Sequence, residues 1–314
     1  MTGAPAAAAT AHTSVLRDEV LAGLMPQAGG LYVDATLGAG GHAAALLAAS
    51  APTGRVIGID RDPAALALTA QRLGDAGGRL QLVHGNFADL PVLLAQAGAP
   101  VVDGLVADLG VSSMQLDRAE RGFSFRHAGP LDMRMDPGQG ESVLALLRRL
   151  DADALADLLF VYGEERRSRR IARAILAALA DGELATTADL AQVVRQSHGG
   201  PPRRRIDPAT RTFQALRIAV NDELAALEAL LAALPQVLRV GGRAALIAFH
   251  SLEDRRVKWS LRQSVDLRPL TKRPIVPTEM ECARNRRARS AKLRIAERLP
   301  RAAALPELGG GGVP

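Results

Sequence analysis

The first hundred residues alternate between short apolar runs and segments of helical composition, and this alternation limits the fold more than any other feature. Apolar runs of strand length are Leu31–Asp34, Arg55–Asp60 and Leu80–His84, and a fourth lies within residues 101–109. Pro63 follows the second run, at a position where the first turn of a helix accepts proline. Strands separated by helices predict βαβ units and a parallel sheet with right-handed crossovers. We therefore expect a doubly wound, Rossmann-like α/β domain.

The pattern changes after the fourth strand. Residues 134–208 contain no convincing buried strand and instead show helical stretches, such as 143–159 and 169–180. Helical periodicity resumes at Thr210 and runs through Leu238, with an interruption expected at Pro235. Gly241 and Gly242 then turn the chain into a fifth buried strand, residues 243–249. These features predict a discontinuous α/β domain, residues 11–133 and 209–305, interrupted by an inserted helical domain at 134–208.

The ends of the chain differ from the rest. Residues 292–296 are expected to form a final edge strand within a basic stretch, residues 284–298. The alanine-rich residues 1–10 and the glycine-rich residues 306–314 are expected to be disordered tails, because neither offers enough apolar surface to order it.

A glycine-rich turn after the first strand predicts a nucleotide site. Residues 38–43 (Gly-Ala-Gly-Gly-His-Ala) fit the pattern G-x-G-x-x-G/A, in which glycines let the backbone approach a ligand at a helix N-terminus. Asp60 lies 22 positions after Gly38 and ends the second strand, where a carboxylate can accept hydrogen bonds from both ribose hydroxyls. Alone, this arrangement suits NAD and S-adenosylmethionine equally.

The next two strand ends favour the methyl donor. Phe87 follows the third strand and offers an apolar ring where an adenine could lie. Asp108 ends the fourth strand and directs a carboxylate to the topological switch point, where ligands of such sheets bind. Three strand ends would thus offer suitable groups to one crevice.

Charge is unevenly divided along the chain. Residues 1–117 carry 5 Arg against 10 Asp and Glu, whereas residues 118–314 carry 34 Lys and Arg against 23 Asp and Glu. A basic second half indicates contact with a polyanion. Its candidate phosphate contacts lie in a proline-bounded loop and in the basic C-terminal stretch: Arg203, Arg204, Arg205, Arg284, Arg286, Arg287 and Arg289. Only 3% of residues are aromatic, which argues against an RNA-binding sheet built on stacked rings.

Other classes of protein are excluded by what the sequence lacks. Cys282 is the single cysteine, so neither an intramolecular disulfide nor a cysteine-based zinc site can form. No spacing of histidines and carboxylates encodes a metal site, and no apolar run reaches the ~18 residues of a membrane-spanning helix. The N-terminus lacks the basic region of a signal peptide, so we expect a cytoplasmic protein.

Six motifs in order make the chain resemble a known family, the bacterial 16S ribosomal RNA cytosine-N4 methyltransferases (small-subunit methyltransferase H). The resemblance extends over nearly the whole chain, from His12 to Arg298. Its motifs are DLGVSS with QLD (108–113 and 115–117), ERGFSF (120–125), GPLDMRMD (129–136), YGEER (162–166), ATRTFQA (209–215) and FHSLEDR (249–255).

The resemblance implies an S-adenosylmethionine-dependent enzyme with a Rossmann-like sheet and an inserted helical domain that recognises the substrate. Its target would be the exocyclic amino nitrogen of a cytidine in the decoding region of 16S rRNA, and its partner the small ribosomal subunit. Carried over by motif, the cofactor residues are Gly40, Gly41, His42, Asp60, Phe87, Asp108 and Gln115. Asp108 and His250 are the candidate acceptors for the amine proton, and a homodimer is compatible with the sequence.

The chain departs from the family at two positions, and two other functions stay open. Met114 and Arg286 stand where the family usually has proline, and the first change loosens the loop that presents Gln115. Ser112 and Ser113 are interpreted as caps of the next helix rather than as part of a base pocket. The glycine turn and Asp60 also permit an NAD-dependent oxidoreductase. The third alternative is a non-catalytic RNA-binding assembly factor.

Overall fold

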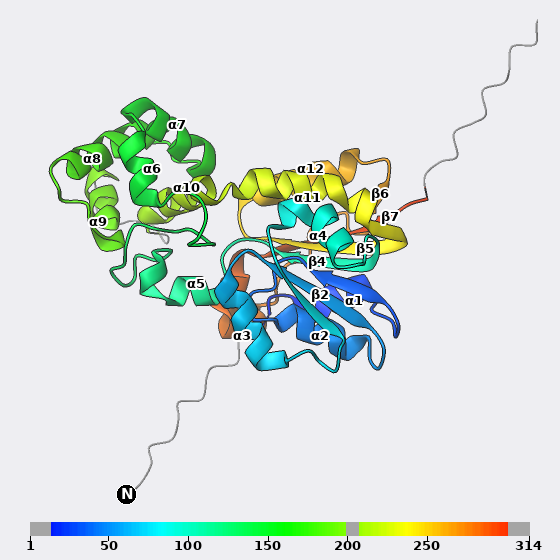
Figure 1. Ribbon diagram of the computed structural model, residues 1–314. Helices are drawn as coiled ribbons and strands as arrows, with labels where there is room; N and C mark the ends of the chain where they lie inside the picture. Colours follow the sequence, from blue (N-terminus) through cyan, green and yellow to red (C-terminus); the bar gives the residue numbers. More distant parts are fainter. Residues whose placement is uncertain (1–13, 199–206, 301–314) are drawn as a thin grey trace, which may run out of the picture.

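The computed structural model describes residues 14–198 and 207–300, which form a seven-stranded sheet covered by helices and a separate helical region beside it (Figure 1). The predicted tails and the basic loop with Arg203, Arg204 and Arg205 lie outside these residues. The strand order is β3-β2-β1-β4-β5-β7-β6. The strands are β1 (Leu31–Asp34), β2 (Arg55–Asp60), β3 (Leu80–His84), β4 (Val102–Asp108), β5 (Leu238–Ala248), β6 (Leu267–Pro269) and β7 (Lys292–Arg298).

The order of the strands confirms the doubly wound, Rossmann-like fold. β1 to β5 run parallel, and the order reverses between β1 and β4, so their carboxyl ends meet at one edge of the sheet. β7 is antiparallel to both of its neighbours. The expected edge position of residues 292–296 is wrong, because β6 pairs with the outer side of β7. Three residues that include Pro269 are too short a strand to read from sequence, and proline is acceptable only at such an edge.

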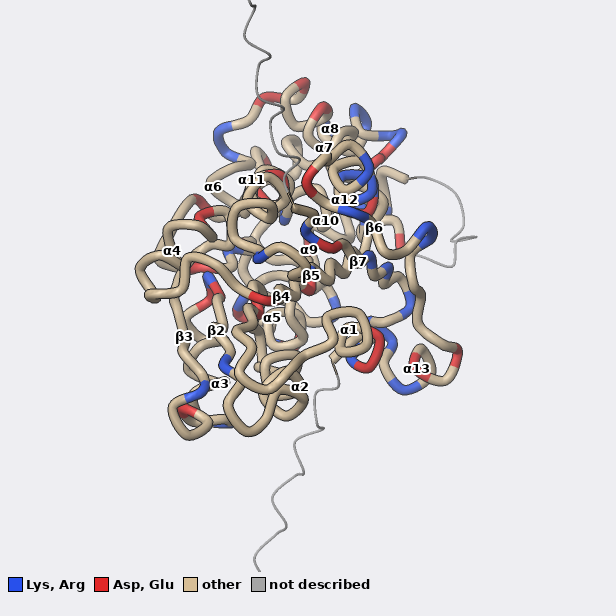
Figure 2. Tube along the Cα trace, turned by 90° about the vertical axis from the view of Figure 1, so that its right-hand side faces the viewer, with Lys and Arg blue, Asp and Glu red and all other residues tan. Residues whose placement is uncertain are grey.

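Helices cover both faces of the sheet (Figure 1). One face packs against α1 (Arg17–Leu24), α2 (Gly41–Ala49) and α3 (Pro63–Leu73), and the other against α4 (Leu90–Gln96), α11 (Glu223–Val237) and α12 (Ser251–Gln263). Lys and Arg gather near α12, β6 and β7 in the side view (Figure 2). Among the described residues, no helix is long and apolar enough to cross a membrane.

The helical region has its own apolar core. Its helices are α6 (Val143–Arg149), α7 (Ala152–Gly163), α8 (Ser168–Ala180), α9 (Thr187–His198) and α10 (Ala209–Asn221). In α8, Ile171, Ile175 and Ala178 are buried at helical spacing, while the arginines of that helix face outward. Buried residues from Phe123 to Leu216 contribute to this core, so it draws on more of the chain than residues 134–208.

Three local expectations were wrong, each because of a specific backbone feature. Residues 143–159 form two helices, since Asp151 caps a new helix by accepting a hydrogen bond from the Ala154 amide. Pro235 lies inside α11, near its end, and the break in residues 210–238 falls at Asp222, whose φ is 48°. Gly241 and Gly242 lie within β5 at a shift in its register with β4, where glycine accommodates a bulge.

The remaining short elements connect these layers and surround the site described below. They are the helices α5 (Ser113–Asp117) and α13 (Glu279–Arg284) and the 3₁₀ turns η1 (Phe87–Asp89), η2 (Ala119–Arg121) and η3 (Arg286–Ser290). α5 and η2 lie between the end of β4 and the helical region, and η3 precedes β7.

Candidate functional site

A pocket opens at the carboxyl ends of β1, β2 and β4. It encloses about 710 Å³, part of it open to solvent. Its lining includes six of the predicted site residues, namely Gly41, His42, Asp60, Phe87, Asp108 and Gln115. Gly40 and His250 are not part of the lining. The residues that sequence reasoning did not assign to this pocket include Ser14, Asn86, Met135 and Arg287.

The glycine turn closes one side of the pocket because no larger residue fits there. Gly40 has a φ of 75° and caps the start of α2, and a Cβ at this position would lie 2.8 Å from the Thr69 side chain. A Cβ on Gly41 would lie 2.0 Å from Ser14 Oγ. The turn therefore brings bare backbone to the pocket at the N-terminus of α2, a position that favours ligand phosphates or carboxylates.

Asp60 fixes this turn with both of its carboxylate oxygens. One oxygen accepts a hydrogen bond from the Gly38 amide at 2.7 Å, and the other accepts one from the Asp62 amide at 2.9 Å. Burial raises the pKa of Asp60 to about 6. Each carboxylate oxygen has a second lone pair, so Asp60 can still accept hydrogen bonds from ligand hydroxyls.

Asp108 presents a buried acceptor to the same pocket. Its Oδ1 atom is buried and forms no hydrogen bond within the described residues. Its Oδ2 atom lies 3.8 Å from Nε2 of His42. The pKa of Asp108 is raised to about 7, chiefly by burial; the positive charge of Arg287 opposes this shift, and the negative charge of Glu253 adds to it. A buried oxygen without a donor is costly, so this position is suited to a donor on a ligand.

Arg287 belongs to the pocket rather than to the outer basic surface. It comes from η3 and donates hydrogen bonds to the Ser113 hydroxyl and the Val111 carbonyl, at the loop that follows β4. Burial lowers its pKa, and the charge of Asp108 opposes that shift. The expectation that Arg287 is a surface phosphate contact is therefore not supported by its placement. Its neighbours Arg284, Arg286 and Arg289 are exposed.

Gln115 reaches the pocket from α5 through a capping box. Its side-chain oxygen accepts a hydrogen bond from the Ser112 amide, and the Ser112 hydroxyl accepts one from the Gln115 amide. Ser112 thus caps α5 as interpreted but also lines the pocket, whereas Ser113 is not a cap and accepts a hydrogen bond from Arg287. Gln115 Nε2 donates to Asp62 Oδ2 at 2.9 Å, so the amide is fixed from both ends despite Met114 beside it.

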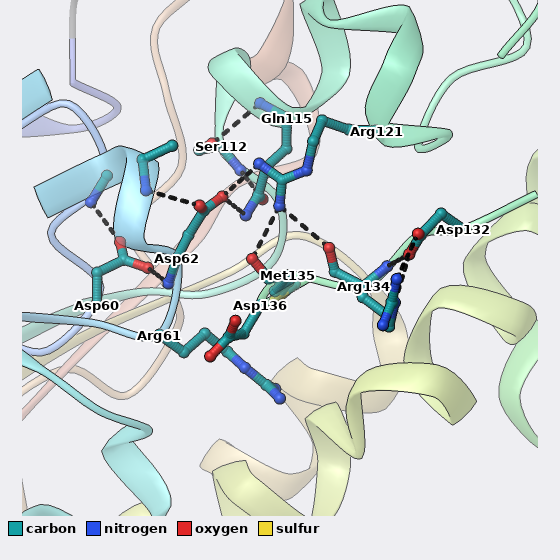
Figure 3. Close-up of polar contacts among 12 residues, drawn as sticks. Asp60, Arg61, Asp62, Ser112, Gln115, Arg121, Asp132, Arg134, Met135 and Asp136 are labelled. Atoms are coloured by element: carbon teal, nitrogen blue, oxygen red, sulfur yellow. Dashed lines mark hydrogen bonds and ion pairs between the residues drawn. The ribbon is translucent and has the colours of Figure 1, made fainter. Parts of the chain in front are cut away.

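Asp62 connects the sheet to the helical region (Figure 3). Its side chain is buried, and Oδ1 caps α3 while Oδ2 accepts hydrogen bonds from Gln115 and from Arg121 at 2.8 Å. Arg121 donates to Asp62 through Nη1, and its Nη2 atom donates to the carbonyls of Arg134 and Met135. Since Met135 lines the pocket, this network sets the position of one pocket wall relative to β2.

His250 has a structural contact outside the pocket. It caps α12 by accepting a hydrogen bond from the Glu253 amide, and Glu253 in turn accepts from the amides of Phe249 and His250. Ligand atoms of Glu223, His250 and Glu253 lie within 4.8 Å of one another. Arg217 holds Glu223 with hydrogen bonds of 2.7 and 2.8 Å, and Nε2 of His250 lies 3.2 Å from Oε1 of Glu253 without forming a hydrogen bond.

Comparison with known proteins identifies the family. The sequence profile of the MraW methylase family matches residues 9–299. The chain belongs to the MraW methylase family. Ribosomal RNA small subunit methyltransferase H of Sorangium cellulosum is 57% identical, over 94% of this chain and 93% of that protein. The protein of the same name from a Geobacter species is 47% identical, over 92% of this chain and 98% of that protein.

A likeness among solved structures is more distant. TrmN from Thermus thermophilus is 13% identical to this methylase, with a TM-score of 0.45 over 90% of this chain and 48% of that chain. The alignments with the two methyltransferase H proteins cover almost the whole length of both chains. The pocket and the helical region therefore both lie within the aligned part.

Replacing Arg121 with Gln should destabilise this methylase strongly, because it leaves the buried Asp62 carboxylate without its cation. We expect a loss of about 3–5 kcal/mol in the free energy of unfolding, measured by urea denaturation. The control is Arg239→Gln, which breaks an exposed ion pair with Asp103 and should leave the stability nearly unchanged. Equal effects of the two variants would contradict the connecting role of Asp62.

Proposed function

We propose that this methylase transfers a methyl group to the exocyclic amino nitrogen of a cytidine in the decoding region of 16S rRNA. The single observation that carries the proposal is the buried Oδ1 atom of Asp108, which lines the pocket without a hydrogen-bond donor. An amino group that must lose a proton needs an acceptor of this kind. The names of the relatives and the motif resemblance supply the substrate class.

S-adenosylmethionine is the cofactor, and the residues of the pocket fit it. When bound, it supplies an activated methyl group on a sulfonium. The bare glycine turn approaches it at α2, Asp60 accepts hydrogen bonds from its ribose, and Phe87 offers a ring beside its adenine. We assign Gly40 to the turn itself, since it shapes the backbone without lining the pocket, and Gln115 and His42 to the opposite walls.

The chain's own contribution to the reaction is orientation and proton acceptance. The amine of cytosine is a weak nucleophile because its lone pair is delocalised into the ring. Asp108 Oδ1, accepting a hydrogen bond from this amine, localises the lone pair and then takes up the proton as the methyl group is transferred. Holding the amine in line with the donor lowers the barrier by several kcal/mol, up to about 7–11 in ideal intramolecular cases. His250 is the weaker candidate, since its side chain caps α12.

The helical region would recognise the substrate beside this pocket. Its core is independent of the sheet, and the Asp62 network fixes it against β2, so it forms a second wall for a large substrate. Arg284, Arg286 and Arg289 are exposed near Arg287 and would contact phosphates. The predictions of a homodimer and of a cytoplasmic location stay predictions.

Two other functions have less support. An NAD-dependent oxidoreductase would have no use for a helical region of this size, and the family match is to methylases. A non-catalytic assembly factor would not need the buried, unpaired Asp108 oxygen, which costs stability unless a ligand uses it.

The direct test uses small ribosomal subunits from cells that lack this modification. Incubation with the protein and S-adenosylmethionine, followed by digestion and mass spectrometry of the nucleosides, should give cytidine methylated on its amino nitrogen. Asp108→Asn should abolish the product, since an amide cannot accept the proton, whereas Asp117→Asn, a nearby change of equal size, should not. Methylation of a different atom, or no methylation despite cofactor binding, would overturn the proposal.

The pH dependence of methylation should report on Asp108. Because its pKa is raised to about 7, the carboxyl is protonated at lower pH and cannot accept the amine proton. The single-turnover rate constant should therefore rise with pH through a midpoint near 7 and level off above pH ~8. Arg287→Gln should move the midpoint to higher pH, since it removes the charge that opposes the shift.

The matched control is Arg289→Gln, which removes an exposed charge two residues away and should leave the midpoint in place. A profile that is flat from pH 5 to 8 would contradict the role given to Asp108. So would a midpoint that Arg287→Gln fails to move.

A further inference from the structure

A second cavity lies between α12, β7 and the loop after β6, apart from the methyl-transfer pocket. It encloses about 780 Å³, part of it open to solvent. Four cationic side chains line it and no carboxylate does: Lys258 and Arg262 from α12, Lys272 from the loop, and Arg294 from β7. A concave surface lined by one sign of charge concentrates counter-ions.

The charges of this cavity are not balanced by their neighbours. Arg294 binds Asp254 at 2.8 Å, and the same carboxylate also binds Lys292. In the part of the chain that the structure describes, no carboxylate forms an ion pair with Lys258, Arg262 or Lys272.

The carboxylates of the adjoining strands are already used. Glu297 of β7 binds Arg243 and Arg268, and Asp266, next to β6, binds Arg298. The cavity therefore keeps a surplus of positive charge. Figure 2 shows Lys and Arg positions in blue along α12 and beside β6 and β7.

The only tryptophan of the chain, Trp259, lies next to the cavity-lining Lys258 but does not itself line the cavity. The Trp259 side chain is on α12 and is 51% exposed, which is unusual for a large apolar ring. The Lys258 ammonium lies 5.7 Å from its ring centroid. An exposed ring beside a cation is the arrangement with which proteins stack on an unpaired base and neutralise its phosphate.

A hydroxyl in the cavity is also available. Thr271 Oγ1 is buried and, among the described residues, has no hydrogen-bond partner. A phosphate oxygen would accept a hydrogen bond from it. Cations, a hydroxyl donor and an exposed ring thus meet within one surface, which suits a nucleotide better than a free anion or an acidic peptide.

We propose that this cavity binds a backbone phosphate of single-stranded rRNA while Trp259 stacks on an adjacent base. The inference rests on the proposed function for its substrate class. α12 begins at the carboxyl end of β5, and β5 is the neighbour of β4, which ends in Asp108. Lys258 lies seven residues after Ser251, the first residue of α12, and therefore about 10 Å further along the helix axis. The surface would hold RNA that leads away from the methylated cytidine.

The test compares affinities for RNA across a salt series. The affinities of the parent and of the triple variant Lys258→Gln, Arg262→Gln, Lys272→Gln are measured for two ligands, unmodified small ribosomal subunits and a single-stranded oligouridine. We expect at least 10-fold weaker binding at low salt, and a salt slope reduced by about 0.7, the value for the loss of one phosphate contact. Trp259→Ala should weaken binding roughly 5- to 100-fold, and Trp259→Phe should retain most of the affinity.

The control triple variant changes to Gln three exposed arginines that do not line the cavity: Arg17, on α1, and Arg55 and Arg239, at the starts of β2 and β5. It should bind RNA almost as the parent does, and S-adenosylmethionine affinity should be unchanged in every variant. Equal losses in the two triple variants would overturn the proposal. So would an unchanged affinity and salt slope for the Lys258, Arg262 and Lys272 variant.

The two proposals can fail separately. If the parent methylates cytidine but the cavity variants bind RNA normally, the cavity proposal is wrong and the proposed function stands. If the parent gives no methylcytidine although the cavity variants lose oligouridine affinity, the cavity proposal stands and the proposed function is wrong.

Discussion

Three carboxylates at the ends of adjacent parallel strands, one fully buried and two partly buried, set the geometry on which the site depends. Asp34, Asp60 and Asp108 end β1, β2 and β4, and burial raises their pKa values to about 7, 6 and 7. Asp34 accepts hydrogen bonds from the amides of Thr36 and Ala43, which fixes the start of α2 against the sheet. Asp60 fixes the glycine turn in a similar way, by accepting a hydrogen bond from the Gly38 amide. Of these three, Asp108 alone keeps a buried oxygen without a donor, and it is the carboxylate that we propose for substrate chemistry.

A second constraint joins this site to the helical region. Asp62 and Arg121 form a buried ion pair with side-chain exposures of 1% and 11%, and such a pair is strongly destabilising when one partner is lost. The same two residues fix Gln115 and the backbone of Met135 at the pocket (Figure 3). Folding of the helical region and completion of the pocket are thus coupled through one contact.

The sequence predicted the parallel strands well because buried strands are continuous apolar runs, and the bounds of β1, β2 and β3 are those expected. It could not place β7, because strand order depends on pairing with the three-residue β6. The error at Pro235 arose because a proline near a helix end removes few backbone bonds. Arg287 and its exposed neighbours look alike in sequence, and only the packing of η3 against the loop after β4 separates them. The Asp62 network joins Asp62 to residues 53 and 59 positions away, and no local pattern marks it.

The central claim is that Asp108 serves the amine and not the cofactor. The measurement that tests it most directly is calorimetric titration of S-adenosylmethionine into the parent, Asp108→Asn and Asp60→Ala, beside single-turnover methylation by each. The account predicts that Asp108→Asn keeps cofactor affinity within about threefold while methyl transfer is lost, and that Asp60→Ala loses more than tenfold in affinity, about 1.4 kcal/mol or more. Loss of cofactor affinity in Asp108→Asn equal to that in Asp60→Ala would contradict it.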